Sequence, residues 1–158
     1  HTGRSVARSH LVGKDAHYLI IFVFISILIV LIDQGVKYAV ERWRPVLDGG
    51  FLVITYGTNT GAGFGILQGQ VLMLTIISLL AAGAMGWYYP HIEKNATPQV
   101  LFALLLGGTI GNLLDRLFRG YVIDFIDVLF WPSFNVADAA ISIAVVGLVW
   151  WYWKNNKA

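Results

Sequence analysis

The acidic residues of this chain are concentrated in one short stretch. Four of its nine Asp and Glu residues lie between Asp115 and Asp138, within a sequence that is otherwise strongly apolar. Asp124 and Asp138 have apolar neighbours and no basic residue at helical spacing. Two carboxylates in such surroundings resist ionising together, and a close pair then shares one proton. That state suits acid–base hydrolysis, in which the ionised carboxylate activates a water and the protonated one stabilises an oxyanion.

The other charged residues near this stretch have structural interpretations. Asp33 and Lys37 are four residues apart, so they share a helix face and are expected to pair, because a lone charge at membrane depth needs its opposite. Arg116 beside Asp115 predicts a clasp between helices. Asp127 lies in a predicted loop and is expected to be solvated.

The composition is that of an integral membrane protein. Hydrophobic residues make up 57% of the 158 residues, charged residues 13%, and the mean hydropathy is +0.67, whereas a soluble domain is about 25% charged. Apolar runs close to the roughly 20 residues that cross a bilayer as a helix predict transmembrane segments. Their approximate bounds are 18–40, 71–89, 99–118 and 136–153, in a single domain over 1–158.

Small residues predict where these helices approach one another. They are Ala81, Ala82, Gly83, Ala84 and Gly86 in the second span and Gly107, Gly108 and Gly111 in the third. We therefore expect an all-α membrane protein, a compact four-helix bundle. Residues 1–10 lack an apolar run and are set aside as an expression remnant.

Charge near the span ends predicts the orientation. Arg4, Arg8 and Lys14 precede the first span, and Lys154 and Lys157 follow the last, whereas the loop 41–58 is balanced in charge. The positive-inside rule then places both termini in the cytoplasm. The end of the first span, both outer loops, the end of the third span and the start of the fourth carry polar residues that lie toward the extracytoplasmic face. Among them is Asn135, either the N-cap of the fourth helix or a member of the site; both interpretations stay open.

Five short motifs occur in order along the chain. They are Asp33-Gln-Gly-Val-Lys37, Asn59-Thr-Gly-Ala-Gly-Phe64, Gly107-Gly-Thr-Ile-Gly-Asn112-Leu-Leu-Asp115-Arg116, Val122-Ile-Asp124-Phe125 and Phe134-Asn135-Val-Ala-Asp138. Together they resemble the lipoprotein signal peptidases (signal peptidase II), intramembrane aspartic proteases of the bacterial cell envelope. Each motif is weak alone, but the ordered set on four spans is specific.

The resemblance implies a function and a set of site residues. Asp124 and Asp138 correspond to the catalytic pair, and the groups that line or brace the site are Asn59, Gly61, Asn112, Arg116 and Asn135. Asp33, Lys37 and Asp115 are expected to be structural. The first outer loop should form a small β-rich element with a mobile flap around Asn59 and the glycines at 57, 61, 63 and 65. The implied substrate is a prolipoprotein, cleaved before its diacylglyceryl-modified Cys.

The resemblance also bears on partners and location. It implies a monomer in the bacterial inner membrane, in contact with lipid and with its active site near the outer face. No cofactor and no metal are expected, and no basic run suggests nucleic acid.

Two other function classes use similar residues. A proton-coupled transporter would place its carboxylates near the midplane and usually show internal repeats, and none is visible. A metal-dependent hydrolase would have only oxygen ligands here, because all four histidines, at positions 1, 10, 17 and 91, lie away from the acidic stretch. Both are weaker than the aspartic protease hypothesis.

Overall fold

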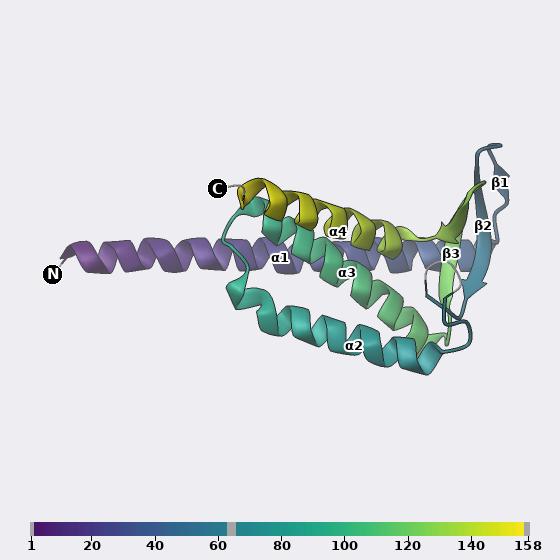
Figure 1. The fold of residues 1–158 in the computed structure, drawn as a ribbon, viewed down its shortest axis with the longest axis horizontal. Coiled ribbons are helices and arrows are strands. Elements are labelled where there is room, and N and C mark those ends of the chain that lie inside the picture. The colour runs from purple at the N-terminus through teal and green to yellow at the C-terminus, as the bar shows by residue number, and fades with distance from the viewer. Residues whose placement is uncertain (1, 63–65, 157–158) are drawn as a thin grey trace.

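The computed structural model contains four long helices and a small sheet at one end of the bundle (Figure 1). It describes the backbone of residues 2–62 and 66–156, and the side chains from residue 15 onward within those ranges. The helices are α1 (Thr2–Trp43), α2 (Val71–Tyr88), α3 (Ala96–Phe118) and α4 (Val136–Asn155), and a short 3-10 turn, η2 (Tyr89–His91), follows α2. Within the described residues, four helical segments are long and apolar enough to cross a membrane, which confirms the predicted spans.

The helix ends follow from local chemistry. Asn95 caps α3 by accepting a hydrogen bond from the backbone N–H of Thr97, so this helix begins three residues before the predicted apolar run. Helix α1 ends at Trp43, directly before Arg44, whose φ of 45° leaves the helical region, and Pro45, which cannot continue the hydrogen-bond ladder. Its membrane-crossing part is Asp15–Trp43.

Helix α3 is the centre of the bundle, and its glycines permit this. It packs extensively against both α1 and α4. A Cβ atom on Gly107 would lie 2.8 Å from the carbonyl oxygen of Ser26 in α1, and one on Gly108 would lie 2.5 Å from that of Ala137 in α4. Both distances are shorter than a real Cβ contact, so larger residues would force the helices apart.

The prediction for the small residues of α2 was wrong. A Cβ atom on Gly83 or Gly86 would meet no atom of the described chain within 4 Å. Helix α2 packs mainly on α3 and leaves most of its surface outside the bundle. Small residues allow two helices to approach closely, but they do not determine which helices do so. Here the packing of α3 against α1 and α4 determines it.

The sheet draws strands from both outer loops, not only from the first as predicted. Its antiparallel order is β1 (Leu47–Asp48), β2 (Leu52–Asn59), β3 (Val122–Val128) and β4 (Trp131–Phe134). β3 alternates faces: Ile123 and Phe125 are buried against Val40 of α1, while Asp124 turns the other way. Asp124 therefore sits on a strand rather than in a loop.

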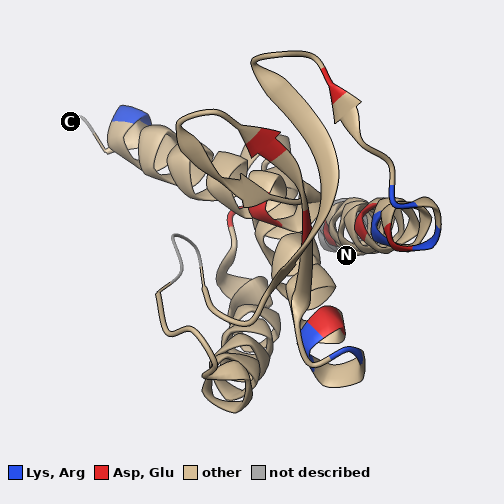
Figure 2. Cartoon of the chain, turned by 90° about the vertical axis from the view of Figure 1, so that its right-hand side faces the viewer, with Lys and Arg blue, Asp and Glu red and all other residues tan. Residues whose placement is uncertain are grey.

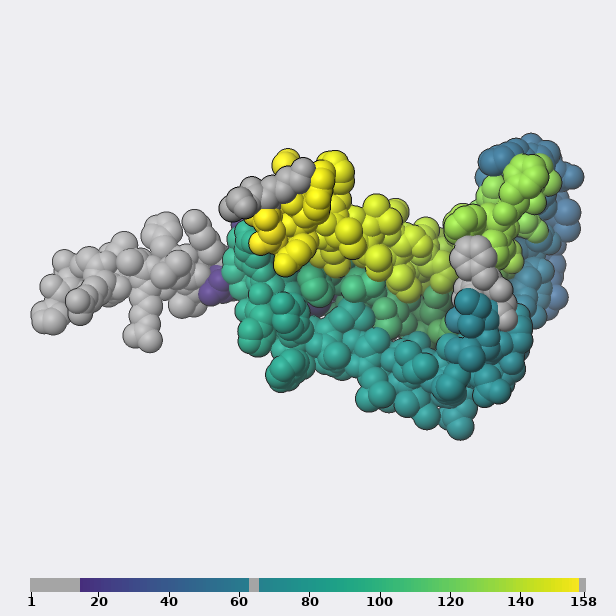
Figure 3. All heavy atoms as spheres, viewed as in Figure 1, coloured from purple at the N-terminus to yellow at the C-terminus, as the bar shows by residue number. Residues whose placement is uncertain are grey.

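The charged residues concentrate at the sheet end. Seen from that end, positions of Asp and Glu lie on the strands of the sheet and on adjoining helix ends (Figure 2). Along the helices, by contrast, large apolar side chains are widely exposed, as a lipid-facing surface requires. In the space-filling view the sheet projects beyond the bundle at the end away from the C-terminus (Figure 3).

Candidate active site

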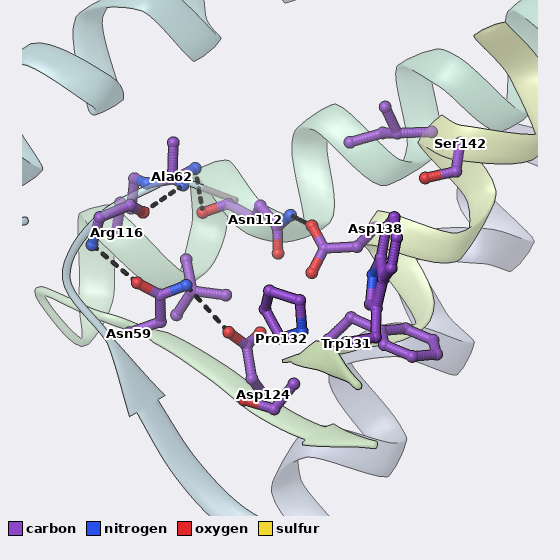
Figure 4. A pocket seen from close by; sticks show the side chains of 14 residues that line it. Asn59, Ala62, Asn112, Arg116, Asp124, Trp131, Pro132, Asp138 and Ser142 are labelled. Carbon is purple, nitrogen blue, oxygen red and sulfur yellow. Dashed lines mark hydrogen bonds between the residues drawn. The ribbon is translucent and has the colours of Figure 1, made fainter. Parts of the chain in front are cut away.

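Asp124 and Asp138 line one cavity of about 190 Å³ beneath the sheet (Figure 4). Asp124 comes from the middle of β3 and Asp138 from the first turn of α4. The cavity is also lined by all of the residues predicted to line or brace the site except the buried Asn135, which touches Asp124 from behind: Asn59, Gly61, Asn112 and Arg116. The structure thus brings together two aspartates that are fourteen residues apart in sequence, through one strand and one helix start.

Neutral amide groups contact the two carboxylates. Asp124 accepts hydrogen bonds from Asn59 Nδ2 at 3.0 Å and from Asn135 Nδ2 at 2.8 Å. Asp138 accepts one from Asn112 Nδ2 at 2.7 Å. In the described part of the chain, neither aspartate forms an ion pair with Lys, Arg or His. Two acids in one cavity with only neutral partners have reason to share a proton.

The amides point their NH2 groups at the aspartates because their oxygens are already engaged. Asn59 Oδ1 accepts from the backbone N–H of Gly61 at 2.8 Å, and Asn135 Oδ1 accepts from that of Asp138 at 2.9 Å. A backbone N–H can only donate, so each amide oxygen must face it and each NH2 group must face away. Both donors toward Asp124 are therefore held by the local fold.

Asn135 performs both of the roles that the sequence left open. It is the N-cap of α4, in a capping box in which the side chain of Asp138 accepts in return from the backbone N–H of Asn135 at 3.3 Å. Its Nδ2 group also contacts Asp124 and Asn112 Oδ1. One residue thus ties the position of Asp138 to that of Asp124.

Burial raises the pKa of Asp124 to about 6. The hydrogen bond from Asn59 opposes this rise, the negative charge of Asp138 adds to it, and the bond from Asn135 and the charge of Lys37 also oppose it. Only 3% of the residue is exposed, so loss of hydration of the charged form is the principal cause. A carboxyl group of this kind is protonated in part of the molecules near neutral pH, as a general acid requires.

A second acidic cluster lies behind the cavity and is fully compensated. Lys37 Nζ is 2.8 Å from Asp33 Oδ2 and 2.8 Å from Asp115 Oδ2, and all three side chains are completely buried. The predicted pairing of Asp33 with Lys37 is confirmed. Asp115 also pairs with Arg119 at 2.7 Å. The cations that pair with Asp115 are thus Lys37 from α1 and Arg119, one helical turn later in α3.

Arg116 links three segments around the cavity, and its contact with α2 is a link between helices of the predicted kind. It donates to the carbonyl oxygen of Gly61 at 3.3 Å and to Ser78 Oγ of α2 at 3.4 Å. Gly61 fits here because a Cβ atom on it would lie 2.8 Å from the carbonyl oxygen of Ile66. Arg116 thus ties the segment after β2 to α3 at Gly61, and it ties α3 to α2 at Ser78. Gly63 and Gly65 of the predicted flap lie outside the described residues.

The sequence did not indicate several residues of this region. Trp131, Pro132, Ser133 and Phe134 of β4 line the cavity, and so do Ile141 and Ser142 of α4. The two α4 residues could have been found from their spacing of three and four from Asp138, which puts them on its helix face. The strand residues carry no such local signal, since their position follows from pairing with β3. Asp127 is exposed, as predicted, but it lies on β3 and not in a loop.

Comparison with known proteins assigns the chain to a family. Residues 25–154 match the family model described as signal peptidase (SPase) II. The chain belongs to the signal peptidase II family. This is a family of aspartic peptidases, so the predicted enzyme class is confirmed.

Relatives and solved structures agree with this membership. The lipoprotein signal peptidase of Syntrophus aciditrophicus (strain SB) is 42% identical over 150 residues, covering 83% of this chain and 91% of that protein. The lipoprotein signal peptidase of Halothermothrix orenii is 35% identical, covering 85% and 97%. A solved bacterial membrane enzyme, determined by the in meso method at 2.3 Å, matches with a TM-score of 0.80 and 31% identity, covering 86% of this chain and 89% of its own. The predicted signal peptidase II fold of helices plus a small sheet is therefore confirmed.

Proposed function

We propose that this signal peptidase II family member removes the signal peptide from diacylglyceryl-modified bacterial prolipoproteins, cutting before the lipidated Cys. The observation that carries the proposal is the pair Asp124 and Asp138 in one cavity, contacted by oriented amides and by no cation among the described residues. This arrangement can keep one proton between two carboxylates. A peptide bond placed between them is open to attack by water without a covalent intermediate.

The reaction needs a base and an acid at the same time. The ionised aspartate takes a proton from the attacking water, while the protonated one donates a hydrogen bond to the scissile carbonyl and stabilises the tetrahedral oxyanion. The proton held by the pair then passes to the leaving amine. Because coupled carboxylates titrate as a unit, the roles of base and acid belong to the pair.

The surroundings of the cavity suit a membrane-borne substrate. Its rim combines polar groups from the sheet and α3 with the apolar side chains of Trp131 and Ile141. The helices below the cavity expose many apolar side chains, so acyl chains attached to the substrate can stay in lipid while its backbone reaches the aspartates. Asn59 and Arg116 hold the segment over the cavity and are placed to position the substrate backbone.

The proposal includes a location. The chain is a multi-pass protein of the bacterial inner membrane with both termini in the cytoplasm and the sheet at the extracytoplasmic face. It acts as a monomer, in contact with lipid, without a cofactor. A reporter fused after Ala158 should then report cytoplasm, and one inserted near Asp48 should report the exterior. A reversed signal at either position would overturn this orientation.

The test is cleavage of a purified lipidated prolipoprotein in detergent or lipid, with and without EDTA. We expect cleavage before the lipidated Cys and full activity after exhaustive chelation. Loss of activity that a divalent ion restores would favour the metal-dependent hydrolase. Cleavage of the unlipidated precursor at the same rate would show that the enzyme does not recognise the diacylglyceryl group.

A further inference from the structure

Three separate hydrogen bonds join the buried cluster of Asp33, Lys37 and Asp115 to residues that adjoin or contact the catalytic pair. The cluster lies outside the cavity, and its side chains are completely buried. Its members were predicted to be structural. The hydrogen bonds that these residues make outside their own ion pairs indicate a more specific role.

Two of these bonds hold the backbone immediately before each catalytic aspartate. Asp33 Oδ1 accepts from the backbone N–H of Ala137 at 2.9 Å, and Ala137 precedes Asp138. Asp115 Oδ2 accepts from the backbone N–H of Ile123 at 3.1 Å, and Ile123 precedes Asp124. The two acids of the cluster thus anchor α4 and β3 at matching positions. Lys37 lies 2.8 Å from each acid and sets the spacing between these anchors.

The third bond determines how Asn112 faces Asp138. Lys37 Nζ donates to Asn112 Oδ1 at 3.0 Å, and Asn135 Nδ2 donates to the same oxygen at 3.1 Å. An ammonium group has donors only, so the amide oxygen of Asn112 must face Lys37 and its NH2 group must face Asp138, as the 2.7 Å bond records. Without the ammonium group, one of the two donors that hold this orientation is lost.

We propose that Lys37, together with Asp33 and Asp115, is a positioning device for the catalytic aspartates. Lys37 orients the Asn112 amide toward Asp138, and the two acids of the cluster align the backbones that carry Asp138 and Asp124. The inference rests on the proposed function of that pair. None of the three residues lines the cavity. Their hydrogen bonds reach the pair through Asn112, Ala137 and Ile123, and Lys37 also acts on Asp124 through its charge.

The central experiment compares Asp33→Asn with the double variant Asp33→Asn/Lys37→Met. The amide oxygen that Asp33→Asn introduces can still accept from Ala137, and Lys37 still binds Asp115 and Asn112, so the single variant should lose less than about tenfold in kcat. The double variant has the parent's net charge and leaves Asp115 its pair with Arg119, but it lacks the donor to Asn112. We expect its kcat to fall by about 10²-fold, as misplacement of reacting groups does, with KM little changed.

A pair of glycine variants provides a test that removes no charge. A Cβ atom on Gly111 would lie 2.8 Å from Asp33 Oδ2, whereas one on Gly107, one turn away, would lie 2.8 Å from the Ser26 carbonyl oxygen. Gly107→Ala and Gly111→Ala should both lower thermal stability. Only Gly111→Ala should lower kcat per folded molecule, with the folded fraction measured by circular dichroism.

The outcomes separate this inference from the proposed function. If Asp124→Asn and Asp138→Asn are inactive while the double variant matches Asp33→Asn in kcat, the positioning role is overturned and the catalytic pair stands. Equal kcat per folded molecule for Gly107→Ala and Gly111→Ala would overturn it in the same way, even if the double variant does not fold. If Asp124→Asn and Asp138→Asn both cleave normally, the proposed function and this inference fail together.

Discussion

Two pairs of aspartates lie at the same end of this bundle in opposite electrostatic surroundings. Asp33 and Asp115 are buried against Lys37, and Asp115 also pairs with Arg119. Asp124 and Asp138 contact amide groups and no cation among the described residues. Asn112 is hydrogen-bonded to both sets, through Lys37 and Asp138. The comparison suggests a division of roles within one polar region. Acids paired with cations hold the structure, and the acids that contact only neutral donors are the ones that we propose transfer protons.

The sharpest test of this contrast removes the exchangeable protons. Asp124→Asn and Asp138→Asn keep the shape of the side chain but cannot act as acid or base. Each should lose at least about 10² to 10⁴-fold in cleavage rate, and the double variant should be little worse because the pair acts as a unit. The measurement is the rate of prolipoprotein cleavage by purified, folded protein.

Asp127→Asn is the matched control, since this exposed residue is only three positions after Asp124 on the same strand. It should cleave at the parental rate. If Asp127→Asn were dead while either of the other two single variants stayed active, the assignment of the pair would be wrong.

Substitutions in the buried cluster of Asp33, Lys37 and Asp115 should lower the stability of the protein. Asp115→Ala leaves the buried Lys37 with a single acid and removes the anchor of Ile123. Breaking a buried ion pair from one side costs about 3–5 kcal/mol of unfolding free energy. Equilibrium unfolding in mixed micelles should show a loss of that order, whereas Asp127→Ala should change stability by less than about 0.5 kcal/mol. Equal effects at the two positions would remove the distinction between buried and exposed acids.

A smaller effect is expected where a neutral donor is removed. Asn59→Ala deletes the amide that contacts Asp124 and accepts from Gly61, so the segment over the cavity loses one of its anchors. A lost hydrogen bond to a charged group is worth about 1.5–3 kcal/mol, so cleavage should slow by about tenfold or more, with the bundle still folded. If Asn59→Ala cleaved at the parental rate, the loop that follows β2 would only connect β2 to α2.

The smallest effect concerns pH and stability. Because burial raises the pKa of Asp124 from 3.8 to about 6, the folded protein holds this proton more tightly than the unfolded chain. The contribution to stability is therefore complete below pH 3.8 and is lost as the pH rises through about 6. Asp124→Asn should remove this dependence, so its stability relative to the parent should increase between pH 4 and 7, by on the order of 1–3 kcal/mol. A constant difference between the two proteins over that range would contradict the raised pKa.

Much of the fold and of the site could be predicted from the amino-acid sequence. The transmembrane helices follow from apolar runs of bilayer length, because a helix satisfies its backbone within its own segment. Asp124 and Asp138 were distinguishable because carboxylates without a nearby cation are rare among apolar residues. Helical spacing was sufficient for the pair of Asp33 with Lys37, which is a local contact. Spacing was also enough, in principle, to include Ile141 and Ser142.

Contacts between distant segments could not be predicted in this way. The partners of Asp115 were not predicted, because Lys37 reaches it from another helix and Arg119 from the next turn. Strand β3 escaped prediction because its partner β2 lies far away in sequence, and the position of β4 follows from its pairing with β3. The prediction of close helix contacts at the small residues of α2 was wrong, because small size permits close approach but does not specify a neighbouring helix.

The sequence by itself determined the membrane class, the helical spans and the identity of the two unpaired acids, since each of these depends on residue type and short-range spacing. Only the tertiary structure decided which amides turn their NH2 groups toward those acids and which backbone groups the buried charges hold. The bond from Ala137 to Asp33 joins residues 104 positions apart. Such a contact exists only after the packing of α1, α3 and α4 has brought their polar ends together, and no local pattern in the chain encodes it.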